Sequence, residues 1–409
     1  MPMSGASWGT ITPDPYGHRQ PSFYPTRPQF FHKTYSTRSR AFDAQEIRTV
    51  NAMLRLSPAL LALSSALALA ANNLPALSLP QVQTTGRVLT DAEGWHATWP
   101  GITLTTRFKG RAIGIVVDDP LSAYTVELDG AIRQPLAMAA ERHTVWLRRL
   151  SNGSHELRLT RRNETTAGPG AIRAFLLENG AWLPAKPAPR RQIEFIGDSF
   201  TAGLADLSRR RSCNAATIRK TSDATAAFGV RVARHFRASW EINAMSGMGM
   251  ARNWNGNLPG ENFRSYYPRL LQNDPLSKVA DANWHPQLVV IGLGINDFST
   301  PLHDGETWTR ETLAAQFKEG YRAMLADLRE RYGDAQIVAT AVRIGPEDQQ
   351  GALVQEVVDA ARAEGDGHIH YLEYAGLELT GCQWHPNLAD HKKMAEILID
   401  RLDTLQVFK

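Results

Sequence analysis

The 409-residue sequence predicts two folded parts of different class, an all-β sandwich followed by an α/β domain built on a parallel sheet. Three observations carry this prediction. Residues 81–183 contain short alternating segments with turn signals and no helical period, which is typical of a sandwich. From residue 191 onward, short apolar segments alternate with helical patterns, which indicates a parallel sheet with helices on both faces. The proline-rich residues 184–190 between them are a predicted semi-rigid linker.

A separate N-terminal stretch precedes both parts. Residues 1–52 are polar, proline-rich and without periodicity, and a different pattern begins at Met53. Arg55 is followed by an apolar run over residues 60–69 that ends in the small-x-small site Ala68-Leu69-Ala70, a pattern typical of a secretory signal peptide. The run is short for a transmembrane span. We therefore interpret residues 53–70 as a signal peptide and residues 1–52 as a disordered, non-native upstream extension; a buried helix is the alternative for the apolar run.

The net charge of +4 belongs to the same stretch. Residues 1–70 carry seven Lys and Arg against three Asp and Glu, and the rest of the chain carries 38 of each. A neutral balance in the folded part gives no reason to expect binding to nucleic acid or, once the signal peptide is cleaved, to a membrane.

Strands and turns of the sandwich follow from a period of two. Apolar side chains alternate over residues 102–106 and 124–128, and Asp129-Gly130 is a turn signal. The segments at 145–147 and 157–159 flank Ser151-Asn152-Gly153, so we predict a hairpin there. Asn163-Glu164-Thr165 has the pattern of an N-glycosylation acceptor, which has meaning only in a eukaryotic secretory pathway.

The α/β part alternates five apolar segments with four helical patterns. The predicted strands are Gln192–Ile196, Trp240–Ala244, Gln287–Leu293, Gln336–Ala341 and His368–Leu372. The predicted helices are Asp223–Phe236, Glu311–Tyr332, Ala352–Ala363 and Leu388–Leu405.

Four loops of this part carry residues suited to acyl transfer. Ser199 follows the first strand in Gly-Asp-Ser, Gly247 and Asn296 follow the second and third strands, and His385 precedes the last helix. The carboxyl ends of parallel strands meet at one edge of the sheet, so these loops can form one site. Ser199 is the predicted nucleophile and His385 its general base. The backbone N–H groups of Ser199 and Gly247 and the Asn296 amide are the candidate oxyanion donors.

Taken in order, the four motifs resemble those of the SGNH (GDSL) hydrolase superfamily over residues 191–409. They are Gly-Asp-Ser at 197–199, Ser-Gly-x-Gly at 246–249, Gly-x-Asn-Asp at 294–297 and His-Pro-Asn at 385–387. With the preceding sandwich, Cys213 and Gly381-Cys382-x-Trp-His-Pro-Asn, the chain is most similar to carbohydrate esterase family two. This resemblance implies a jelly-roll sandwich, a three-layer α/β/α SGNH domain, and removal of acetyl groups from plant-wall polysaccharides.

One position departs from the superfamily pattern. An Asp usually stands three residues before the histidine, and Cys382 occupies that place here. The resemblance to family members with a Ser–His dyad implies a histidine held by a backbone carbonyl, with an acid from elsewhere as the alternative. The two cysteines, Cys213 and Cys382, are expected to pair in an exported chain, with two separate buried thiols as the alternative.

We therefore expect a secreted or periplasmic, monomeric serine esterase that acts on acetylated polysaccharide or oligosaccharide of the acetyl xylan or glucomannan type. No cofactor or metal is expected, because His368-Ile369-His370 has no accompanying carboxylate or thiolate cluster. Trp384 is a candidate sugar platform, with simple packing as the alternative. A lipase, thioesterase or lysophospholipase, and a carbohydrate-binding protein with a decayed site, remain open. Other polar-aromatic residues of the loops favour sugar: Trp254, Asn255, Asn257, Tyr266, Tyr267 and Trp284.

Overall fold

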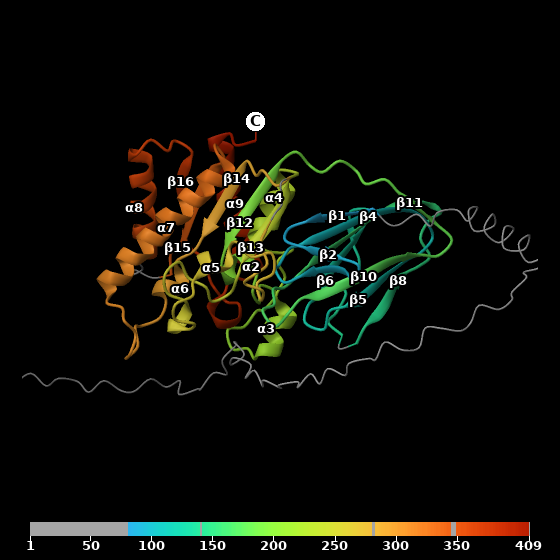
Figure 1. Cartoon of the computed structure of the whole chain (residues 1–409), viewed down its shortest axis with the longest axis horizontal. Coiled ribbons are helices and arrows are strands. Elements are labelled where there is room, and N and C mark those ends of the chain that lie inside the picture. Colours follow the sequence, from blue (N-terminus) through green and yellow to red (C-terminus); the bar gives the residue numbers. More distant parts are fainter. Residues whose placement is uncertain (1–80, 140, 280–282, 345–348, 409) are drawn as a thin grey trace, which may run out of the picture. The chain divides into compact units, whose positions relative to one another are not determined.

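The computed structural model describes residues 81–139, 141–279, 283–344 and 349–408, and it confirms the predicted fold class. The N-terminal part is an antiparallel sandwich of two sheets, and the C-terminal part is a parallel five-stranded sheet with helices (Figure 1). The predicted signal peptide at 53–70 and the upstream extension at 1–52 lie outside the described residues.

The sandwich strands are β1 Val82–Thr85, β2 Leu89–Asp91, β3 Gly94–Ala97, β4 Thr103–Gly110, β5 Ile113–Asp118, β6 Tyr124–Leu128, β7 Ala131–Ile132, β8 His143–Leu147, β9 Gly153–Arg161, β10 Gly170–Leu177 and β11 Ala181–Leu183. One sheet has the order β1-β4-β9-β6-β7, with β11 paired to β4, and the other has the order β2-β3-β10-β5-β8. Alternate side chains of both sheets, among them Phe108, Ile115 and Val126, form the core between them.

The hairpin predicted around Ser151-Asn152-Gly153 is wrong. β8 pairs with β5 in one sheet, whereas β9 pairs with β4 and β6 in the other, so the chain crosses between sheets at this turn. Turn-forming residues suit such a crossing as well as a hairpin, so the sequence pattern does not distinguish the two. Asp129 and Gly130, with φ of 56° and 78°, do join two paired strands, β6 and β7.

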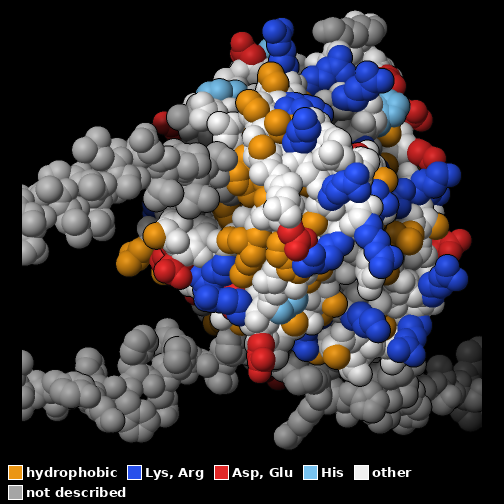
Figure 2. Space-filling model, turned by 90° about the vertical axis from the view of Figure 1, so that its right-hand side faces the viewer, with side chains coloured by type: hydrophobic (Ala, Val, Ile, Leu, Met, Phe, Trp, Pro, Cys, Tyr) orange, Lys and Arg blue, Asp and Glu red, His pale blue; other side chains and the backbone are white. Residues whose placement is uncertain are grey.

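The outer surface of the sandwich is rich in Lys and Arg (Figure 2). In the chain from the sandwich to the linker, Arg148 is paired with Glu178, Arg173 with Asp118 at 2.8 Å, and Lys186 with Glu156 at 2.7 Å. The exposed pair of Arg148 and Glu178 contributes little to stability, and all three pairs partly neutralise the local charge.

The parallel sheet has the order β13-β12-β14-β15-β16. Its elements in chain order are β12 Gln192–Gly197, α2 Ser199–Ala202, α3 Ala215–Thr221, α4 Phe228–His235, β13 Ser239–Ala244, η1 Trp254–Gly256, α5 Phe263–Tyr266, β14 Leu288–Gly292, α6 Ile295–Phe298, α7 Arg310–Tyr332, β15 Gln336–Val342, α8 Gln350–Ala363, β16 Ile369–Tyr374, η2 Cys382–Trp384 and α9 Leu388–Leu405. None of the described helices is both long and apolar enough to cross a membrane.

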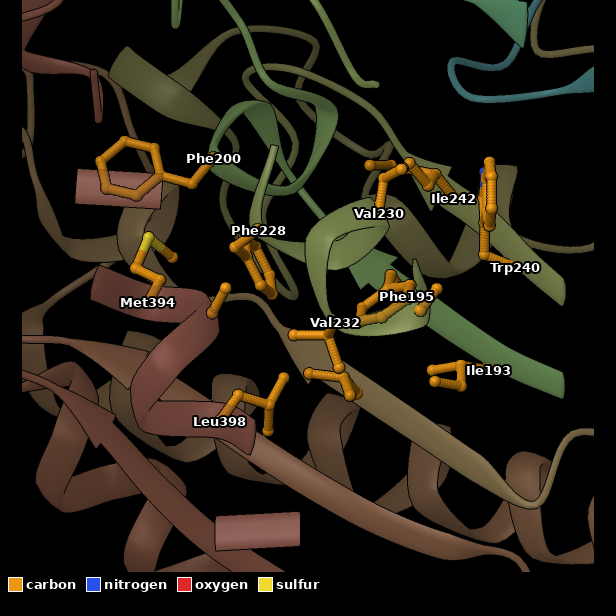
Figure 3. Packing of buried hydrophobic residues seen from close by; sticks show 14 of the residues in the cluster. Ile193, Phe195, Phe200, Phe228, Val230, Val232, Trp240, Ile242, Met394 and Leu398 are labelled. Carbon is orange, nitrogen blue, oxygen red and sulfur yellow. The ribbon is translucent and has the colours of Figure 1, made fainter. Parts of the chain in front are cut away.

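Helices α4 and α9 pack together on one face of this sheet, while α7 and α8 lie on the other (Figure 1). Phe195 of β12, Phe228 and Val232 of α4 and Leu398 of α9 belong to the resulting core (Figure 3). Phe195 and Phe228 meet edge to face, with ring centroids 5.9 Å apart. This rigid layer supports the loops that follow the strands.

Helix α4 begins at Phe228, five residues later than the predicted Asp223. The preceding residues contact the sandwich instead of starting the helix. The N–H of Ala224 donates to the carbonyl of Arg162 at 2.7 Å, and the guanidinium of Arg162 lies 2.9 Å from the Asp223 carboxylate. A tertiary contact has thus overridden the helical pattern.

The sandwich also packs against the edge strand β13. The Trp240 indole donates to the carbonyl of Gly101 at 3.1 Å. Gly101 has φ of 71°, and a Cβ there would stand 2.6 Å from Ile242, so only glycine allows this close approach. Nearby, the Arg87 guanidinium lies 4.8 Å from the Trp99 ring and 4.8 Å from the Tyr267 ring, which joins the two parts through buried cation–π contacts.

Candidate active site

Ser199 lies at the carboxyl end of β12, on a sharp turn into α2. The Asp198 carboxylate accepts the N–H of Phe200 at 3.0 Å and caps this short helix. A Cβ at Gly197 would stand 2.1 Å from the Thr201 hydroxyl, so glycine is required where the strand turns. The turn places Ser199 beside the loop that precedes α9.

His385 lies on a strained loop. Gln383 and Trp384 have φ of 55° and 59°, a conformation that non-glycine residues adopt at a cost of about 1–3 kcal/mol each. The N–H of Gly381 donates to the His385 carbonyl at 2.9 Å, and a Cβ at Gly381 would stand 2.7 Å from that oxygen. On the far side, Asn387 caps α9 in a reciprocal box with Asp390. The surrounding structure thus fixes the path of the loop.

The side chains of Ser199 and His385 are hydrogen-bonded. The Ser199 Oγ lies 2.8 Å from His385 Nε2, and His385 Nδ1 lies 2.8 Å from the Cys382 carbonyl oxygen. A carbonyl can only accept, so Nδ1 carries the proton and donates. Nε2 is then the free acceptor for the hydroxyl proton of Ser199. Burial lowers the pKa of His385, and its backbone carbonyl partner offsets part of that shift.

Cys382 is joined to Cys213 by a disulfide. The Gln383 N–H donates to the Arg211 carbonyl at 2.7 Å, and Arg211 Nε donates to the Leu379 carbonyl at 3.0 Å. Cys382 is buried at 1% exposure. The segment around Cys213 therefore holds the histidine loop by one covalent bond and by hydrogen bonds.

The candidate oxyanion donors come from two further loops. Asn296, in the first turn of α6, donates through Nδ2 to the Met248 carbonyl at 2.9 Å and to the Asp198 carboxylate at 3.3 Å. Gly247 precedes Met248 and has φ of 78°. In the part of the chain that the structure describes, no backbone carbonyl accepts the Gly247 N–H. Through its two hydrogen bonds, Asn296 links the loop of Gly247 and Met248 to Asp198, the residue before Ser199.

Comparison with known proteins identifies the family. Residues 84–187 match the family described as Carbohydrate esterase 2 N-terminal, and residues 195–394 match the GDSL-like Lipase/Acylhydrolase family. An acetylxylan esterase / glucomannan deacetylase of Cellvibrio japonicus is 33% identical over 327 residues, which are 78% of this chain and 89% of that protein. The chain belongs to carbohydrate esterase family 2. It is a carboxylic ester hydrolase of the SGNH type.

Solved structures of family 2 esterases have the same fold. A carbohydrate esterase whose active site "displays divergent catalytic and non-catalytic binding functions" superposes with a TM-score of 0.73 at 32% identity, covering 80% of this chain and 98% of that one. A family two carbohydrate esterase from Clostridium thermocellum in complex with cellohexaose gives a TM-score of 0.72 at 27% identity, covering 80% of this chain and all of that one.

Two buried carboxylates shape the loops of this family 2 site. Asp297 accepts the N–H groups of Met250, Ala251 and Arg252 at 2.9, 2.7 and 2.9 Å. Burial raises the pKa of Asp297 to about 6 and that of Asp198 to about 7. Among the described residues, neither carboxylate is hydrogen-bonded to the His385 ring, so neither occupies the place of a third triad acid.

The aromatic residues of the site loops divide into exposed and buried groups. Trp384 is 61% exposed with the Arg211 guanidinium 5.6 Å from its ring, and Trp254 is 43% exposed. The expectation that Tyr266, Tyr267 and Trp284 offer a sugar surface is wrong, because packing buries all three. Among the described residues, no three His, Cys, Asp or Glu side chains are grouped as metal ligands.

Sequence reasoning missed one residue at this site. Glu164, a residue of the sandwich, accepts the backbone N–H of Ser246, which directly precedes Gly247. The only sequence signal at this position was the surrounding glycosylation pattern. Its Asn163 is 6% exposed, and its amide is hydrogen-bonded at both ends, to the N–H of Ala123 and to the carbonyls of Leu121 and Glu164.

Proposed function

We propose that this family 2 esterase is exported and removes O-acetyl groups from plant-wall polysaccharide or oligosaccharide of the acetyl xylan or glucomannan type. Ser199 is the nucleophile of the proposed reaction, and His385 is the general base. The observation that carries the proposal is the 2.8 Å hydrogen bond from Ser199 Oγ to His385 Nε2 in a chain of this family. An acetylxylan esterase / glucomannan deacetylase among its relatives supports the substrate class.

In the first half of the reaction, His385 Nε2 takes the hydroxyl proton while Ser199 Oγ attacks the acetyl carbonyl carbon. The imidazolium that forms is stabilised at Nδ1–H by the Cys382 carbonyl, which lies 2.8 Å away. A carbonyl carries only a partial negative charge, so it fixes the orientation of the ring and stabilises the cation less than a carboxylate would.

The tetrahedral intermediate bears a negative oxygen. The N–H groups of Ser199 and Gly247 and the Asn296 Nδ2 are the proposed donors to this oxygen. Asn296 holds two acceptors in the free enzyme, and the longer bond, 3.3 Å to Asp198, is the one that we expect it to exchange for the oxyanion.

Collapse of the intermediate expels the sugar oxygen, which takes the proton from His385 Nε2 and leaves as an alcohol. The acetyl group stays on Ser199 as an ester. A water molecule then gives a proton to the same nitrogen while its oxygen attacks the ester carbonyl. The second tetrahedral intermediate collapses as Ser199 Oγ leaves and takes this proton back from His385, and the acetic acid released ionises to acetate.

Export and a monomeric state complete the proposal. The signal-like pattern at 53–70 and the single pair of cysteines joined in a disulfide both favour an oxidising compartment outside the cytosol.

Trp384 is proposed as a sugar platform, because its ring is exposed beside His385 instead of being packed in the interior.

The test is incubation with chemically defined acetylated xylo- and glucomanno-oligosaccharides, followed by mass spectrometry, with Ser199→Ala as the control. Loss of acetyl groups with the natural chain only is expected. A preference for 4-nitrophenyl octanoate over 4-nitrophenyl acetate would favour the lipase reading. Binding of the oligosaccharides without hydrolysis of any ester would instead identify a carbohydrate-binding protein with a decayed site.

A further inference from the structure

The loop that bears Gly247 is held from the sandwich. Both carboxylate oxygens of Glu164 receive the N–H of Ser246, at 3.0 Å and 3.1 Å. Glu164 follows strand β9 of the sandwich, and Ser246 follows strand β13 of the catalytic sheet. A carboxylate of one domain is therefore bonded to the backbone of the loop that supplies a candidate oxyanion donor.

The backbone around Glu164 is itself rigid. The carbonyl of Glu164 accepts the Asn163 amide at 3.1 Å, and the other bonds of that amide tie it to the chain at 121–123. The next residue, Thr165, donates its N–H to the Thr98 carbonyl at 3.0 Å. The carboxylate is thus presented from a fixed part of the sandwich.

The two residues before Ser246 are fixed in the same way. The Met245 N–H donates to the Gly197 carbonyl at 3.0 Å, and Gln272 Nε2 donates to the Ala244 carbonyl at 3.1 Å. The N–H of Gln272 in turn donates to the Thr98 hydroxyl of the sandwich at 2.8 Å. Direct and indirect contacts from one domain therefore converge on residues 244–246.

We propose that Glu164 is a positioning residue for catalysis: its bond to the Ser246 N–H fixes the orientation of the backbone that leads into the Gly247 oxyanion donor. The proposal rests on the proposed role of Gly247. Oxyanion donors are effective because they are aimed before the reaction and need no reorganisation during it. The sandwich then contributes to the rate of the reaction through this contact.

The charge of Glu164 acts at the same place. Burial raises the pKa of Glu164 to about 7, although the hydrogen bonds from Ser246 act to lower it. The charge of Glu164 also contributes to the raised pKa of Asp198, the residue before Ser199. A buried carboxylate costs free energy unless its hydrogen bonds compensate. A half-buried carboxylate whose charge acts on the residue before the proposed nucleophile is more typical of a functional site than of a purely structural contact.

The test compares Glu164→Leu with Glu164→Gln, because both side chains approximate the shape of Glu and only Gln keeps an acceptor for the Ser246 N–H. The control is Glu127→Leu. Glu127 of the sandwich forms an ion pair with Arg234 of α4, so this variant removes another contact between the two domains, one that does not involve the Gly247 loop. The readouts are kcat and KM for 4-nitrophenyl acetate, and Tm.

We expect kcat to fall by about tenfold to a hundredfold in Glu164→Leu, with KM little changed, since misplacement of one donor acts on the transition state. Glu164→Gln should recover most of the loss. Glu127→Leu should lower Tm and keep kcat. Equal kcat in Glu164→Leu and Glu164→Gln, or unchanged kcat in Glu164→Leu, overturns the role of Glu164 while the esterase assignment stands. An inactive natural chain would instead contradict the proposed function itself.

Discussion

Replacing Cys213 with Ser removes the disulfide to Cys382, and we expect it to lower both stability and turnover. The bond spans a sequence separation of 169 residues. For a loop of that length the chain-entropy model gives about 5 kcal/mol as an upper figure, and measured disulfides commonly contribute about 2–4 kcal/mol. For a domain of this size we therefore expect Tm to fall by about 5–10 °C.

The effect on turnover follows from the position of Cys382. Its carbonyl is the acceptor that orients His385 Nδ1, and the disulfide sulfur belongs to the same residue. Without the disulfide, the loop keeps two hydrogen bonds: the Gln383 N–H donates to the Arg211 carbonyl, and Arg211 Nε donates to the Leu379 carbonyl. The loop should loosen without unfolding. We expect kcat to fall about tenfold, which corresponds to about 1.4 kcal/mol in the activation barrier.

The assay is hydrolysis of 4-nitrophenyl acetate well below the Tm of the variant, with Cys382→Ser and the reduced natural chain as parallel samples. Titration of thiols in the denatured, unreduced protein checks the bond itself, and two reactive thiols would show that it is absent. Full kcat in Cys213→Ser with a lowered Tm would refute the reasoning, because the hydrogen bonds through Arg211 would then suffice to hold the histidine loop.

The remaining predictions concern the reaction itself. Ser199→Ala and His385→Ala should each abolish nearly all turnover, and the double variant should be little worse than either, since nucleophile and base act as a unit; substantial activity in Ser199→Ala contradicts this. Asn296→Ala should lower kcat by roughly a hundred- to a thousandfold in a folded protein; an effect on KM alone would show that Asn296 binds substrate instead. His385 must be neutral to accept the proton, and burial lowers its pKa from 6.5, so kcat/KM should fall on acidification with a midpoint below pH 6.5; a higher midpoint would contradict this direction. Trp384→Ala should raise KM for acetylated oligosaccharides and leave kcat for 4-nitrophenyl acetate unchanged; unaltered KM for the oligosaccharides would argue against a sugar platform.

The positions of the candidate site residues were readable from the sequence because each depends on local structure. A strand followed by Gly-Asp-Ser places Ser199 on a turn, and a capping residue such as Asn387 marks the start of the last helix after His385. The order of parallel strands then brings such loops to one edge. The resemblance to the family also supplied the idea of a backbone carbonyl behind the histidine.

What the sequence could not show depends on contacts between distant segments. Glu164 and Ser246 are 82 positions apart, and nothing local to either one predicts their bond. Helix α4 begins later than predicted because the Ala224 N–H donates to the carbonyl of Arg162 in the sandwich. Tyr267 looked like a surface aromatic of a loop, yet it is buried, and the Arg87 guanidinium lies near its ring. Side-chain type and spacing do not reveal which face a partner domain covers.

The packing of the sandwich against β13 bears on how these domains can be separated. β13 is an edge strand, and Trp240 on it bonds to Gly101 of the sandwich, while Arg87 lies 4.0 Å from the buried Glu194. A shortened chain that began at residue 191 would expose an unpaired strand edge and leave a buried acid without its cation, and such edges promote aggregation. Expression of the catalytic half alone, or exchange of the sandwich for that of another esterase, would therefore demand redesign of this boundary.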